Sequence, residues 1–148
     1  MQTEQVSQSF IEAYQGSFSN MLRWEQLDNL WSQVRQSRQA WHIYAVGEAP
    51  PEQTVSAEQL KLFLTEITAL LREEHQEDYC GIVYTNDKNN PTFIKIYDPN
   101  NLGVVCGFSS NPPLPGWILS VVPPSDLQVV LPQTSSRKRW WQRIFSAP

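Results

Sequence analysis

The sequence has few cysteines and no long apolar run, and both absences limit the classes of protein to which it can belong. Two cysteines in 148 residues are too few for the disulfide framework of a small secreted domain. No segment approaches the roughly 18–20 consecutive apolar residues of a membrane-spanning helix. The first residues lack the basic start and apolar stretch of a signal peptide. We therefore expect a single cytoplasmic globular domain, because this length suffices for one hydrophobic core.

The chain also lacks the short motifs of the common enzyme and metal-binding classes. It contains no G-x-G-x-x-G, G-x-x-x-x-G-K-[ST] or G-x-S-x-G, and no C-x-x-C or H-E-x-x-H. The polar segments 86–90 and 98–101 offer oxygen atoms but lack the glycine and final glutamate of an EF-hand loop. We expect turns there, and neither a cofactor nor a metal site.

Charge is unevenly distributed along the chain. Residues 1–132 carry 7 basic and 15 acidic side chains, a net charge of −8. Residues 133–148 carry four basic side chains and no acidic one. Because an acidic body repels phosphate, we do not expect a nucleic-acid partner.

Apolar spacing predicts three helices. Two lie within residues 4–38 and are separated by a break near residues 16–20, where Ser19 or Asn20 would cap the second. A single bent helix stays an alternative. The third covers residues 56–76 and begins with a capping box. Its apolar stripe consists of Leu60, Phe63, Leu64, Ile67, Leu70 and Leu71.

Residue type and flanking turn signals predict five strands. They cover residues 41–46, 80–85, 92–97, 104–108 and 117–122. In the first run, alternation places Trp41, Ile43 and Ala45 on one face and His42, Tyr44 and Val46 on the other. The first two runs and the helix between them are compatible with a right-handed parallel crossover, and the last four predict an antiparallel meander.

Together these elements predict an α+β fold. Two N-terminal helices precede a β-α-β-β-β-β order, and the helices pack on one face of a mixed, mostly antiparallel sheet. Residues 1–124 form the globular domain, residues 125–136 a linker, and residues 137–148 a basic aromatic amphipathic tail.

The tail is the most distinctive segment. On a helix, its large apolar residues fall within an arc of roughly 140° and most of its cations cover the other side. Its candidate partner-binding residues are Arg137, Lys138, Arg139, Trp140, Trp141, Arg143, Ile144 and Phe145. Three interpretations stay open: docking on the acidic body, docking in a groove of a partner protein, and association with an anionic membrane surface.

Few residues are suited to catalysis. The weak candidates are His42, His75, Cys80 and Asp98. Cys80 and Cys106 lie two strands apart in the predicted meander, at least about 9–10 Å, so we expect two separate reduced thiols.

The leading hypothesis is a small non-enzymatic cytoplasmic accessory protein that acts through a protein partner, with the tail as its docking segment. The alternatives are a small enzyme with a cleft lined by His42, Tyr44, Cys80 and Asp98, an α+β cone that binds a small ligand among its aromatic side chains, and a peripheral membrane protein. The chain has the general look of a bacterial protein, which implies nothing about its chemistry.

Overall fold

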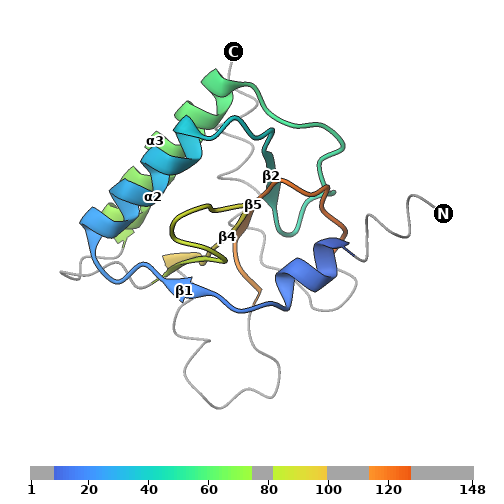
Figure 1. Ribbon diagram of the computed structural model, residues 1–148, viewed down its shortest axis with the longest axis horizontal. Coiled ribbons are helices and arrows are strands. Elements are labelled where there is room, and N and C mark those ends of the chain that lie inside the picture. Colours follow the sequence, from blue (N-terminus) through green and yellow to red (C-terminus); the bar gives the residue numbers. More distant parts are fainter. Residues whose placement is uncertain (1–8, 75–81, 100–113, 128–148) are drawn as a thin grey trace.

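The computed structural model describes residues 9–74, 82–99 and 114–127 (Figure 1). Two long helices lie side by side, α2 (Trp24–Gln36) and α3 (Ala57–Glu74). The strands are β1 (Ser19–Asn20), β2 (His42–Ala45), β3 (Val83–Thr85), β4 (Phe93–Ile96) and β5 (Trp117–Ser120). Residues 9–14 form a further helical segment. The predicted α+β class is therefore confirmed.

The strands form one sheet in the order β1-β3-β4-β5-β2, and every ladder between them is antiparallel. The parallel crossover that the sequence allowed is not formed, because β2 pairs with β5 and two strands separate it from β3. The predicted strand 104–108 lies outside the described residues.

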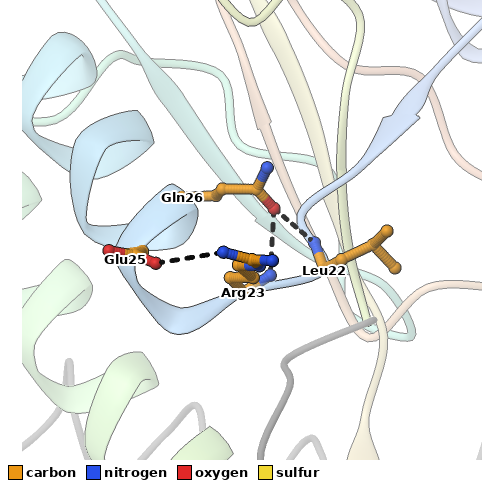
Figure 2. A network of polar contacts seen from close by, with 4 residues as sticks. All are labelled: Leu22, Arg23, Glu25 and Gln26. Carbon is orange, nitrogen blue, oxygen red and sulfur yellow. Dashed lines mark hydrogen bonds and ion pairs between the residues drawn. The ribbon is translucent and has the colours of Figure 1, made fainter.

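The predicted cap of the second helix is also wrong. Ser19 and Asn20 form β1, which pairs with Thr85 and Tyr84 of β3. Helix α2 begins later, and its first turn is closed by the side chain of Gln26 (Figure 2). The Gln26 Oε1 atom accepts hydrogen bonds from the backbone N–H groups of Leu22 and Arg23, at 3.0 and 2.9 Å. These bonds satisfy two donors ahead of the helix and fix the turn between β1 and α2.

Helix α3 follows its predicted pattern closely. The Ser56 hydroxyl accepts a hydrogen bond from the Gln59 N–H at 3.1 Å, and the Gln59 side chain accepts one from the Ser56 N–H at 2.9 Å. This is the predicted capping box. Phe63, Leu64 and Ile67 of the stripe are at most 1 % exposed. No helix of the described segments is long and apolar enough to cross a membrane.

Helices α2 and α3 cover one face of the sheet, which we call the inner face. The Trp31 indole N–H of α2 donates to the Thr68 hydroxyl of α3 at 2.9 Å, so the two helices are also joined by a polar contact. Ile43 and Ala45 of β2 point into this core, as their alternation predicts.

A second apolar cluster covers the opposite, outer face of the sheet. Tyr44 and Val46 belong to it, again as predicted, together with Phe10 of the helical segment 9–14. The Phe10 ring lies 5.3 Å from the Phe93 ring and edge-on to Tyr44. The helical segment 9–14 therefore lies on the face away from α2 and α3, whereas the sequence analysis placed all helices on one face.

The globular part extends to Leu127. This side chain is 3 % exposed in the outer cluster, and its backbone N–H donates to the Tyr44 hydroxyl at 3.0 Å. Residues 125–127, which the sequence analysis assigned to the linker, are thus packed against the sheet. The rest of the linker and the tail lie outside the described residues.

Candidate functional site

Lys95 of β4 lies on the outer face of the sheet. Its neighbours in β4, Ile94 and Ile96, are completely buried in the inner core. Because side chains alternate along a strand, Lys95 points to the opposite face, beside Phe93 of the outer cluster. Its side chain is only partly exposed there.

Two aromatic rings enclose the Lys95 ammonium. The Nζ atom lies 4.0 Å from the ring centroid of Tyr14 and 4.0 Å from that of Phe18. Tyr14 ends the helical segment 9–14, and Phe18 lies in the chain that follows it. A cation over an aromatic face is favourable by about 0.5–2 kcal/mol, so these contacts also hold the N-terminal segment against the sheet.

Two tyrosines extend the aromatic surface on the neighbouring strands. Tyr84 of β3 is the cross-strand partner of Lys95, and Tyr97 lies two residues beyond Lys95 in the chain. The rings of Tyr84 and Tyr97 meet edge to face with centroids 5.6 Å apart. We call these five partly exposed residues the Lys95 cluster: Tyr14, Phe18, Tyr84, Lys95 and Tyr97.

The electrostatics of the Lys95 cluster follow from desolvation. Burial lowers the pKa of Lys95 from 10.5 to about 8, because the ring-lined site solvates an ammonium less well than water does. Burial also raises the pKa of Tyr14, and the Tyr97 phenol adds to this increase. The pKa of Tyr97 rises through burial and then through Tyr84. Among the described residues, no hydrogen bond or ion pair reaches the Lys95 ammonium.

The Lys95 cluster therefore combines aromatic rings, phenol groups and a partly exposed amine, and its two cation–π contacts join Tyr14 and Phe18 to strand β4.

The residues predicted for catalysis are not brought together where the structure describes them. His42 is 6 % exposed, and its Nδ1 atom lies 3.1 Å from the backbone oxygen of Ser120. Asp98 is 5 % exposed. His42 lies level with Ser120 and Phe93, whereas Asp98 is five residues beyond Phe93, roughly 16 Å along the strand direction. His75, Cys80 and Cys106 lie outside the described residues.

Two other kinds of feature bear on ligand binding, a cluster of metal-ligating side chains and a surface pocket. Within the described ranges, no three His, Cys, Asp or Glu side chains gather as a metal ion would require. A pocket of about 170 Å³ lies between α2 and the turn after β3, lined by Gln26, Asn29, Gln33 and Lys88 among others. It is smaller than the roughly 300–1,000 Å³ of ordinary small-molecule sites.

Comparison of this chain with protein-family models, with curated proteins and with solved structures finds no match. The site is therefore defined by its geometry alone.

The Lys95 cluster was not predicted from the sequence. The local signal was present, since a lysine stands between two isoleucines in a predicted strand and Phe93 and Tyr97 share its face. The contribution of Tyr14 and Phe18 was not accessible, because they were assigned to the apolar face of an N-terminal helix. Only the tertiary position of that segment brings them to Lys95.

Proposed function

We propose that this protein is a small non-enzymatic cytoplasmic binding or accessory protein that docks on a protein partner through its basic aromatic tail, residues 137–148. The observation that carries the proposal is the separation of charge and aromatic residues between body and tail. The body has a net charge of −8, whereas the tail has four cations and two adjacent tryptophans.

The tryptophans of the body pack within its own core. Trp31, Trp41 and Trp117 are at most 3 % exposed. Trp24 is partly buried, and the Arg72 guanidinium lies 4.6 Å from its ring centroid. The body thus has an aromatic core of its own, which supports a separate role for Trp140 and Trp141 in the tail.

The chemistry of the tail indicates the kind of partner. Four cations favour a surface with carboxylates, and an aromatic stripe favours an apolar groove that buries it. An acidic groove on another protein offers both. The separation of His42 from Asp98 favours binding over the alternative of a catalytic cleft.

The test begins with affinity capture by the full-length protein and by the Trp140→Ala/Trp141→Ala variant, followed by binding of the captured protein in purified form. We expect saturable binding by the full-length chain and at least a tenfold weaker affinity for the variant, because paired aromatic anchors dominate such interfaces. Equal affinities would refute docking through the tail.

A matched pair of charge variants distinguishes a specific role of the tail from a general effect of net charge on binding. Arg137→Gln/Arg139→Gln and Arg35→Gln/Arg38→Gln each remove two positive charges, and Arg35 and Arg38 are exposed on the body. We expect only the tail pair to weaken binding to the purified partner. If the body pair weakens it equally, general electrostatic attraction explains the binding and the proposal fails.

Vesicles test the membrane alternative. We expect no sedimentation of the full-length protein with vesicles of phosphatidylcholine and 30 mol % phosphatidylglycerol at about 0.15 M salt, because the acidic body opposes the tail. Sedimentation that depends on Trp140 and Trp141, without a protein partner, would replace the proposal by peripheral membrane association.

A further inference from the structure

The pocket between α2 and the turn after β3 combines apolar and polar lining residues. Its apolar part is formed by Met21 and Leu30, which are each 2 % exposed. The other described lining residues carry amide groups or an ammonium group, and none carries a carboxylate: Gln26, Asn29, Gln33, Lys88 and Asn89. Residues 1–132 have a net charge of −8, so a pocket lined by a cation and no acid is a local exception that suits an anion.

The hydrogen bonds of the two glutamines determine which amide atom each of them leaves unused. The Gln26 Oε1 atom accepts from two backbone N–H groups, so its Nε2 atom is left as a donor on the other side of the amide (Figure 2). The Gln33 Nε2 atom donates to the backbone oxygen of Lys88 at 2.7 Å, which leaves its Oε1 atom as an acceptor. Among the described residues, no hydrogen bond or ion pair reaches the Asn29 amide or the Lys88 ammonium. These donors are therefore available to a ligand.

The two sides of the pocket are held in place by hydrogen bonds. The contact between Gln33 and Lys88 joins α2 to the turn after β3. Within the turn, the Asp87 Oδ1 atom accepts hydrogen bonds from the N–H groups of Asn89 and Asn90, at 2.8 and 3.2 Å. A lining that is fixed in this way before binding lowers the entropy lost when a ligand binds.

We propose that this pocket binds a small carboxylate that carries one compact apolar group, about the size of a benzene ring. Its volume is about 170 Å³, and an apolar cavity of about 150 Å³ is large enough to hold benzene. The apolar group contacts Met21 and Leu30, and the carboxylate accepts hydrogen bonds from the Lys88 ammonium and the Asn29 amide. The site lies on the body and is independent of the tail.

The experiment titrates full-length protein, labelled with ¹⁵N, with sodium benzoate and follows the side-chain amide signals by NMR. Sodium chloride keeps the ionic strength constant, and benzyl alcohol is the uncharged probe of similar shape. We expect the signals of Gln26 and Asn29 to shift saturably with benzoate, with a dissociation constant of about 1 mM, and benzyl alcohol to bind at least about fivefold more weakly. No shift of these signals up to about 20 mM benzoate, or equal binding of the two probes, would overturn the proposal.

Two variants of exposed residues test recognition of the carboxylate. Asn29→Asp keeps the shape of the side chain and adds a negative charge to the pocket, so we expect benzoate to bind at least about tenfold more weakly. Lys88→Gln removes the cation, and we expect a loss of about fivefold. Both variants are first confirmed as folded by circular dichroism.

Lys61→Gln is the matched control for Lys88→Gln. It removes the same charge from an exposed position of α3 and does not alter the pocket lining, so we expect benzoate affinity to stay unchanged. If Lys61→Gln weakens binding as much as Lys88→Gln does, general electrostatic attraction explains the binding and the site is refuted. Unchanged affinity in Asn29→Asp would likewise place benzoate elsewhere on the protein.

Discussion

The contact between Tyr44 and Leu127 attaches the last described residues to the outer face of the sheet, and removal of one oxygen atom tests it. In the Tyr44→Phe variant, the Leu127 N–H loses the acceptor that lies 3.0 Å away. Tyr44 is completely buried and Leu127 is 3 % exposed, so water cannot easily replace the lost hydroxyl. The ring itself is retained, and its packing against Phe10 is unchanged.

The expected cost follows from the buried donor. A buried N–H left without an acceptor costs about 1–3 kcal/mol. The Tyr44 hydroxyl also donates to the carboxylate of Asp126, but Asp126 is exposed and water can solvate it after the change. We therefore expect Tyr44→Phe to lower the free energy of unfolding by about 2 kcal/mol. Leu127→Ala, which removes a buried side chain, should cost about 2–3 kcal/mol.

Urea denaturation followed by tryptophan fluorescence measures both variants. A loss of about 2 kcal/mol lowers the midpoint by roughly 1 M, given the usual urea dependence for a protein of this size. The control is Tyr84→Phe, because no hydrogen bond joins the Tyr84 hydroxyl to any described residue, and it should change stability by less than about 0.5 kcal/mol. If Tyr44→Phe is as stable as this control, residues 125–127 are not packed on the sheet in solution.

Three further variants test other parts of the fold. Ser56→Ala should lower stability by about 1 kcal/mol by removing the capping hydroxyl of α3, measured by thermal denaturation against the exposed control Ser17→Ala; equal melting temperatures would contradict the role of the cap. Phe10→Ala should cost about 3–4 kcal/mol in urea, whereas Glu12→Ala, exposed on the same segment, should cost almost nothing; equal effects would mean that the segment does not cover the outer face. Burial lowers the pKa of Lys95 to about 8, against 10.5 in the unfolded chain, so the unfolded chain binds more protons between these two pH values. The free energy of unfolding therefore rises with pH in this range, and the cost of burying the charged amine is fully present below pH 8. After allowance for the partial exposure of Lys95, we expect a gain of about 1 kcal/mol in the stability of the unmutated protein relative to Lys95→Met between pH 7.5 and 9.5. If the difference in stability between the two proteins is the same at both pH values, the pKa of Lys95 is not lowered.

The sequence predicted those elements whose signals are local. The capping box at Ser56 and the apolar stripe that follows depend only on neighbouring residues, and both are confirmed. The alternation in β2 correctly assigned Ile43 and Tyr44 to opposite faces for the same reason.

The errors concern features that depend on distant parts of the chain. Ser19 and Asn20 are typical helix-capping residues, yet their pairing with β3 makes them a short strand. The order of strands was inferred from chain order, whereas β2 pairs with a strand near the other end of the described chain. The candidate site was missed for a related reason, because Tyr14 reaches Lys95 only after the N-terminal segment packs on the outer face.

The pairing of β2 with β5 has a consequence for how the chain folds during synthesis. His42 and its partner Ser120 are 78 positions apart, and among the described strands β2 pairs with β5 alone. Strand β2 therefore leaves the ribosome long before its partner β5 has been synthesised. Until β5 emerges, the backbone of β2 has no strand to pair with and its apolar side chains are incompletely buried. Such long-range closure slows folding and leaves an unpaired strand edge on the nascent chain, which is the kind of intermediate that chaperones protect.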